Sequence, residues 1–140
     1  MSSGYAAWAP LAAVAAGSLG AVLRWACVAW WHGVLAKRTS DPDPFPAGVL
    51  LANTIASFIA GVLLPVAAVV GTSWRLVIVA GLCGGLSTLS TLAVDTVAMW
   101  QRGQHRSALG NALANIGLGV AAAALGTGVL GQAIAAALSR

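Results

Sequence analysis

The chain has 140 residues, of which 59% are hydrophobic and only 7% are charged, with a net charge of +4. A soluble domain carries about 25% charged residues, so we exclude a water-soluble protein and expect one small domain over residues 1–140 whose solvent is lipid. The basic residues are dispersed, which argues against nucleic-acid binding and indicates anchors at the surface of a cell membrane.

Four segments are long and apolar enough to cross a bilayer as helices, which requires roughly 20 residues each. The expected spans are 6–31, 47–70, 76–100 and 108–138. The first ends in a tryptophan cluster, which suits a membrane interface, and closely spaced prolines then predict a non-helical loop. The fourth is rich in Gly and Ala, so we expect it to pack tightly against its neighbours. The sequence therefore predicts an all-α, multi-pass membrane protein.

Loop charges give a weak indication of topology. Loops one and three hold Lys37, Arg38, Arg102 and Arg106, and the opposite side holds Arg75 and Arg140. This difference favours both termini outside, with a margin small enough to permit insertion in both orientations. Four short helices enclose little volume, so we expect an oligomer.

The third span contains the unusual stretch "GLCGGLSTLSTLAVD", residues 81–95. Gly84 and Gly85 weaken the helix, and Ser87 or Thr88 is a candidate N-cap for a second half-helix. The first half would then present free carbonyls, which suit a small hard cation such as Na⁺. The alternative is a helix kinked for packing, with its hydroxyls bonded back to the preceding turn.

Three polar residues lie inside the spans, and two of them invite two interpretations each. Asn53 either joins helices by hydrogen bonds or offers two N–H donors to an anion. Arg24 is a functional candidate by its depth, or else snorkels to the interface. Asp95 is expected at most to pair with an Arg near a span end. Because no nucleophile–base pair, phosphate loop or ligand cluster is present, we expect no enzyme.

Three motifs together resemble those of the CrcB/Fluc fluoride channels. "GSLGAVLRW" is similar to the family's GxxGAxxRY, "GVLLANTIASFIAG" to GTLxVNxxGSFxxG, and "GLCGGLSTLSTL" to GFCGGLTTFSTF. They occur in the family's order, one in each of the first three spans, and the resemblance extends over about the whole chain.

The resemblance implies a passive exporter of cytoplasmic fluoride, built as an antiparallel, dual-topology dimer with two narrow pores. It also implies a structural Na⁺ at the dimer centre, which is not transported. By motif position, the backbone carbonyls of Gly84 and Ser87 in each subunit would hold this ion. Arg24 matches the arginine of the first motif and would lie near the pore entrance.

The same resemblance implies pore-lining roles for Asn53, Ser90 and Thr91. Fluoride is small and strongly hydrated, so amide and hydroxyl donors must replace its water. The family also turns the positive ring edges of two phenylalanines toward the ion. Here these pore positions hold Leu89 and Leu92, which keep the i, i+3 spacing on one helical face but have no quadrupole.

This departure leaves several functions open. We hypothesise that the chain is one half of a heterodimer whose paralogous partner keeps the phenylalanines; a homodimer with altered conduction competes with this. A non-conducting subunit would explain the leucines but leaves Asn53 and the Gly-Gly break without a purpose. A small multidrug antiporter is the weakest rival, because proton coupling needs a membrane carboxylate and the first span has no acid.

Overall fold

A computed structural model describes residues 4–35 and 45–138, and all regular structure in this part of the chain is helical. Helix α1 is Ala9–Leu35 and α2 is Ala47–Val70. The third rod comprises α3 (Thr72–Arg75), the π-helical η1 (Leu76–Cys83), α4 (Gly84–Leu86) and α5 (Leu89–Gln101). The fourth comprises α6 (His105–Leu125), the π-helical η2 (Gly126–Gly131) and α7 (Gln132–Leu138). The four rods are each long and apolar enough to cross a membrane, which confirms the prediction of an all-α membrane protein whose third helix is broken.

Glycines in the left-handed region set two of the helix ends. Gly71 has a φ of 85° and separates α2 from α3, so the turn between these rods is shorter than the sequence suggested. Residues 72–75, which lie between the expected spans 47–70 and 76–100, are helical. Gly103 has a φ of 77° and follows α5, where its N–H donates to the Trp100 carbonyl at 3.0 Å. Such a C-terminal glycine satisfies carbonyls that the helix leaves open.

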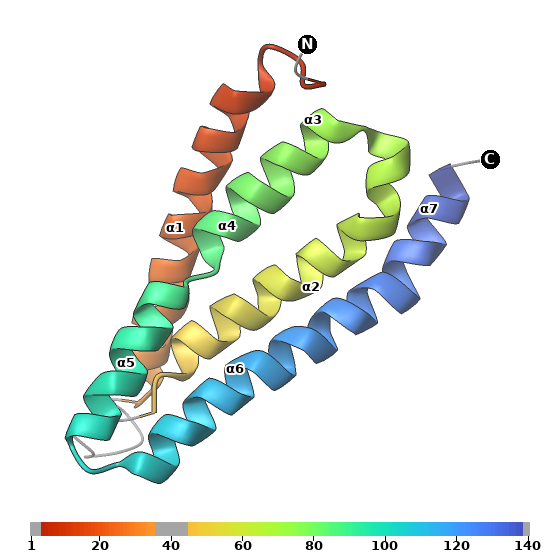
Figure 1. Cartoon of the computed structure of the whole chain (residues 1–140). Helices are drawn as coiled ribbons and strands as arrows, with labels where there is room; N and C mark the ends of the chain where they lie inside the picture. Colours follow the sequence, from red (N-terminus) through yellow and green to blue (C-terminus); the bar gives the residue numbers. More distant parts are fainter. Residues whose placement is uncertain (1–3, 36–44, 139–140) are drawn as a thin grey trace.

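The rods are arranged in two closely packed pairs (Figure 1). Helix α1 lies along η1 and α4, and α2 lies along α6 and η2. Glycines make both seams: a Cβ on Gly85 would meet the Gly17 carbonyl oxygen, and a Cβ on Gly61 would meet the Ala123 carbonyl oxygen. The fourth span therefore packs against α2 at backbone distance, as its small residues predicted.

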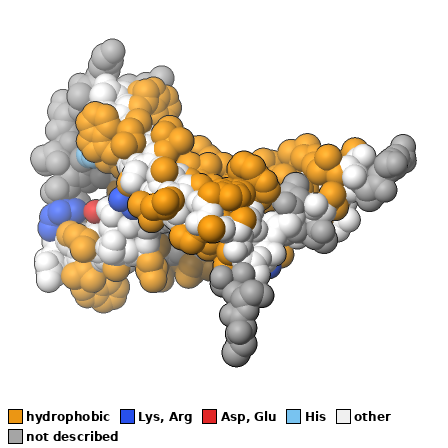
Figure 2. All heavy atoms as spheres, turned by 90° about the horizontal axis from the view of Figure 1, so that it is seen from above, with side chains coloured by type: hydrophobic (Ala, Val, Ile, Leu, Met, Phe, Trp, Pro, Cys, Tyr) orange, Lys and Arg blue, Asp and Glu red, His pale blue; other side chains and the backbone are white. Residues whose placement is uncertain are grey.

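The distribution of polar and apolar side chains is inverted relative to a soluble protein. Hydrophobic side chains cover much of the described surface (Figure 2). Leu11, for example, is 78% exposed. The described interior instead holds small residues and amides, and its largest fully buried side chain is Asn111. This pattern is that of a protein solvated by lipid, because buried amides need partners whereas exposed leucines need none in hydrocarbon.

Aromatic side chains gather at both ends of the rods. Trp8 and Trp74 pack with ring centroids 5.2 Å apart at one end. At the other end Trp30 and Trp31 pack at 6.3 Å, and Trp100 lies against His105. Such belts mark the two membrane–water interfaces, so the chain is a multi-pass membrane protein.

Candidate functional site

The third rod is interrupted after Leu86, just beyond the glycine pair. Ser87 and Thr88 have extended backbones, with ψ values of 146° and 116°, and α5 then starts at Leu89. Gly84 and Gly85 themselves are helical. The break thus lies where the predicted N-cap at Ser87 or Thr88 requires it, and Gly85 brings the backbone against α1.

Thr88 is the N-cap of α5, one of the two caps that the sequence predicted. Its Oγ1 accepts the Thr91 N–H at 3.2 Å and lies 3.1 Å from the hydroxyls of both Ser90 and Thr91. These three hydroxyls form a compact cluster at the start of the half-helix. Because hydroxyls rotate freely, the cluster can exchange donor and acceptor roles without moving the backbone.

Asn53 of α2 bonds directly to the interrupted backbone. The Thr88 N–H donates to Asn53 Oδ1 at 2.8 Å, and Asn53 Nδ2 lies 3.4 Å from the Thr88 carbonyl oxygen. The backbone N–H at the break is therefore the hydrogen-bond donor to Asn53, the single strongly polar side chain of α2. A backbone N–H is always a donor, so it also fixes which end of the carboxamide faces α5.

A chain of side-chain hydrogen bonds runs from Asn53 through Asn115 and Asn111 of α6 to Thr96 of α5. We call these four residues the asparagine relay. Asn53 Nδ2 donates to Asn115 Oδ1 at 2.8 Å, and Asn115 Nδ2 donates to the Asn111 carbonyl and side-chain oxygens at 3.0 and 3.2 Å. Asn111 Nδ2 donates to Thr96 Oγ1 at 2.9 Å, returning the relay to α5. Three helices are thus joined by buried side-chain hydrogen bonds.

The hydrogen bonds of the relay all run in one donor-to-acceptor direction, which is fixed by the contacts at both ends. At one end the Thr88 N–H turns Asn53 Nδ2 toward Asn115. At the other end Thr96 donates its only hydroxyl proton to the Leu92 carbonyl at 2.7 Å, so its oxygen must accept from the relay. Among the described residues no buried side-chain N or O atom lacks a hydrogen-bond partner. Such a fully satisfied network is rigid.

An open cavity of 170 Å³, which we call the groove, lies beside the break. Its lining includes Asn53, Ser87, Thr88, Leu89, Leu92 and Asn115. The structure therefore brings together four of the residues that the sequence assigned to a pore or ion site. Leu89 is 78% exposed, so the groove has an aliphatic wall on one side and polar atoms on the other.

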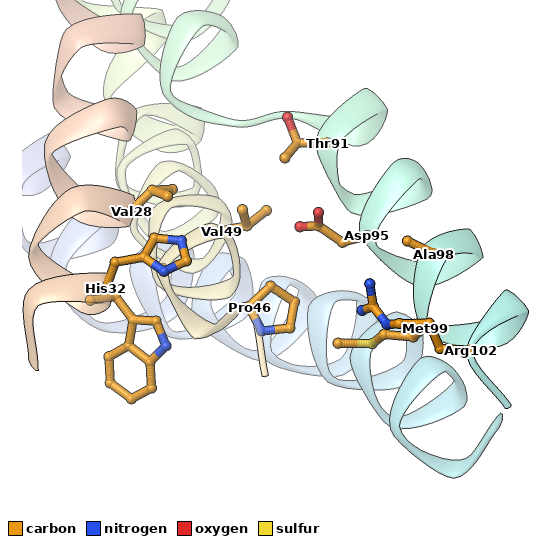
Figure 3. A pocket seen from close by; sticks show the side chains of 11 residues that line it. Val28, His32, Pro46, Val49, Thr91, Asp95, Ala98, Met99 and Arg102 are labelled. Carbon is orange, nitrogen blue, oxygen red and sulfur yellow. The ribbon is translucent and has the colours of Figure 1, made fainter. Parts of the chain in front are cut away.

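A second cavity of 270 Å³, the vestibule, opens between α1, α2 and α5 (Figure 3). Its lining includes His32, Pro46, Val49, Thr91, Asp95 and Arg102. Thr91 thus faces the vestibule rather than the groove. Its hydroxyl, 3.1 Å from the groove-lining Thr88 Oγ1, connects the two cavities by a hydrogen bond.

Two other predicted site residues lie apart from both cavities. Ser90 is exposed at the start of α5, and its hydroxyl contacts Thr88. Arg24 is half-buried one turn after Gly20, which packs on the third rod, and is not among the lining residues of the groove or the vestibule. Lys37, Arg38 and Arg140, which contributed to the topology prediction, lie outside the described residues.

Sequence reasoning missed the α6 half of the site. Asn111 and Asn115 are two polar residues spaced i, i+4 in an otherwise small and apolar span, which places them on one helical face. That spacing was a usable signal. Thr96 carried no such signal, because a Thr in a membrane helix ordinarily satisfies itself on the preceding turn.

The carbonyls of Gly84 and Ser87 fit a hard cation. In a continuous helix they would accept from the N–H groups of Thr88 and Thr91. Here the Thr88 N–H donates to Asn53, and the Thr91 N–H donates to Thr88 Oγ1. Both carbonyls therefore lose their usual donors, as unwound carbonyls that bind Na⁺ in transport proteins do.

The sequence profile of the family described as "CrcB-like protein, Camphor Resistance (CrcB)" matches residues 11–127. The chain belongs to the CrcB family. It is 38% identical over 106 residues to the "Fluoride-specific ion channel FluC" of Nitrosomonas europaea, covering 73% of this chain and 78% of that relative. Proteins of the same name match from Pyrococcus abyssi, 38% identical over 71% of this chain and 77% of the relative, and from Pseudomonas aeruginosa, 34% identical over 89% and 86%.

Family membership confirms the resemblance seen in the three motifs. The relatives of this CrcB chain are named as ion channels, in agreement with the prediction that it is not an enzyme. The matched residues include both halves of the asparagine relay and the break. The relay, the break and the residues that line the two cavities therefore lie within the matched part of the chain.

Proposed function

We propose that this CrcB chain is a fluoride-selective channel subunit that lets fluoride leave the cytoplasm passively. The observation that carries the proposal is the hydrogen-bonded pair of side-chain amides, Asn53 and Asn115, beside an interrupted helix. The relatives of this chain are named fluoride-specific channels. Carboxamide N–H groups and hydroxyls are the donors that a strongly hydrated anion requires in a low-dielectric path.

In the described structure the Nδ2 hydrogens of Asn53 and Asn115 bond to protein acceptors. An anion entering the groove would take these donors in exchange, while the freed carboxamide oxygens turn away. The charge-assisted hydrogen bonds to the anion, stronger than those between neutral amides, would offset the loss of these bonds. In this proposal Asn53 has both of the roles that its sequence position left open: it joins helices by hydrogen bonds, and it donates to an anion.

A second subunit is part of the proposal, because the groove is open on one side. Leu89 lines it yet is 78% exposed, and a narrow anion path needs a wall there. We propose an antiparallel dimer, in agreement with the weak charge bias of the loops. The partner is a second copy of this chain or a paralogous subunit.

We further propose that a structural Na⁺ lies at the centre of this dimer. The carbonyls of Gly84 and Ser87 from each subunit would hold it, because their usual amide donors bond elsewhere. A bound cation would neutralise the converging carbonyl dipoles. Exchanging Na⁺ for N-methylglucamine should then lower the melting temperature and promote dissociation to monomers in detergent, whereas unchanged melting and dimer content would reject the ion site.

The decisive experiment is reconstitution of the purified chain in liposomes loaded with fluoride. We expect rapid fluoride efflux that a potassium ionophore accelerates, with far slower efflux from chloride-loaded liposomes. Protein-free liposomes give the baseline. Efflux at that baseline from a well-folded dimer would reject the homomeric channel.

Leu89 and Leu92 favour one alternative form of this function. Because neither side chain presents a positive edge to an ion, the chain would be a half-channel that conducts only beside a phenylalanine-bearing paralogue. Co-reconstitution with such a subunit should then raise efflux above the sum of the two separate preparations. Rapid, selective efflux from the chain alone would exclude the need for that partner.

A further inference from the structure

The vestibule contains an acid where an anion path should avoid one. Asp95 is half-buried on α5, and its carboxylate points into the cavity (Figure 3). Thr91 lies one turn before Asp95 and lines the same cavity. Its hydroxyl is 3.1 Å from the hydroxyl of Thr88, which lines the groove, so the vestibule adjoins the groove. A lone negative charge at this place would repel any anion approaching the relay, and the low-dielectric walls would strengthen the repulsion.

Arg102 supplies a positive charge on the same wall. It follows Asp95 by seven residues and is the C-cap of α5, and both side chains line the vestibule. Its guanidinium turns back along the helix toward the cavity that both side chains line (Figure 3). His32 of α1 lines the same cavity.

We propose that Arg102 is a specificity-determining residue, which offsets the Asp95 carboxylate and so admits anions to the vestibule. Among the described lining residues, His32, Asp95 and Arg102 are the ones that carry or can gain charge. α2 contributes none of them. Lys37, Arg38, Asp41 and Asp43 precede α2 but lie outside the described residues. The proposal rests on the proposed function only in naming fluoride as the admitted anion.

A charge-selective labelling experiment tests the proposal without conduction. Ala98 lines the vestibule, and Ala98→Cys provides a thiol there; the parent chain, with Cys27 and Cys83 alone, gives the background. The rates of modification by an anionic and a cationic methanethiosulfonate are compared as a ratio. We expect Arg102→Gln to lower the anionic-to-cationic ratio several-fold, Asp95→Asn to raise it, and the double variant to return near the starting value.

Fluoride efflux gives the second measurement. Arg102→Gln should slow efflux several-fold, and adding Asp95→Asn should restore most of it. Arg106→Gln is the matched control, because Arg106 is exposed in the next helix and is not a lining residue. The effects should shrink as salt is raised, since a 1 M electrolyte screens over about 3 Å.

The outcomes separate this proposal from the channel itself. An unchanged labelling ratio in Arg102→Gln overturns the proposal, as does a flux loss that Asp95→Asn leaves in place. If the unmodified chain passes no fluoride, the proposed function fails, and the labelling ratio still decides what Arg102 does.

Discussion

The backbone N–H of Thr88 donates to Asn53 Oδ1 across 2.8 Å, and this bond ties the break in the third rod to the one strongly polar side chain of α2. The bond has two consequences. It removes the donor that the Gly84 carbonyl would have in a continuous helix, and it directs Asn53 Nδ2 toward Asn115. One contact thus shapes the candidate cation site and the candidate anion path together.

Replacing Asn53 by Leu should abolish most fluoride efflux. A hydrogen bond to a charged group contributes about 1.5–3 kcal/mol, so losing one donor to the anion lowers the rate by roughly tenfold to a hundredfold. The measurement is initial efflux from liposomes, with dimer content checked by size-exclusion chromatography. Thr54→Val is the neighbouring control, because Thr54 only bonds the Leu50 carbonyl one turn back. Full efflux from Asn53→Leu would instead favour a non-conducting role for the groove.

The sequence predicted the helices and the N-cap of this site better than the hydrogen bonds that join them. Hydropathy located the four rods, and the hydroxyl run identified Thr88 as one of two N-caps. The bond from the break to Asn53 was less accessible, because it joins residues 35 positions apart. Glycines weaken a helix anywhere, but here Gly84 and Gly85 are helical, Gly85 packs against α1, and the backbone opens after them.

The α6 half of the relay escaped prediction for a related reason. Asn111 and Asn115 share a helical face, yet the sequence does not say which face α6 turns toward α2. That orientation is set by the seam at Gly61 and Gly126, where a Cβ on Gly126 would lie 2.5 Å from the Phe58 carbonyl oxygen. Packing of the small residues therefore determines which amides meet.

Replacing Leu89 and Leu92 together by Phe should raise fluoride efflux from the chain alone. Both side chains line the groove, so phenyl rings there would turn positive edges toward an ion beside Asn53. Initial efflux is compared with that of the double Leu→Met variant, which changes shape without adding a quadrupole. Equal efflux in the Phe and Met variants would show that ring edges have no role in this groove.

Thr96→Val should destabilise the fold through the relay. The variant keeps the shape of the side chain but removes the acceptor of Asn111 Nδ2, and a buried donor without a partner costs about 1–3 kcal/mol. Thr96→Ser should retain most of the stability. Thr54→Val is again the control, since Thr54 makes the same 2.7 Å bond to a carbonyl four residues back. Unfolding in mixed detergent measures the difference, and equal losses in the two Val variants would contradict a role for the relay.

Gly85→Ala should disrupt the seam between α1 and the third rod. A Cβ at this position would meet the Gly17 carbonyl oxygen, which belongs to backbone and cannot rotate away, so the helices must separate. Overpacking of this kind costs about 1–3 kcal/mol, and the shift would also carry the break away from Asn53. Gly117→Ala is the matched control, because a Cβ there meets nothing within 4 Å; it should change stability by less than about 1 kcal/mol. The added methyl group is the same in both variants, so a difference between their unfolding midpoints measures the helix contact itself. Equal midpoints would mean that α1 and the third rod do not approach this closely.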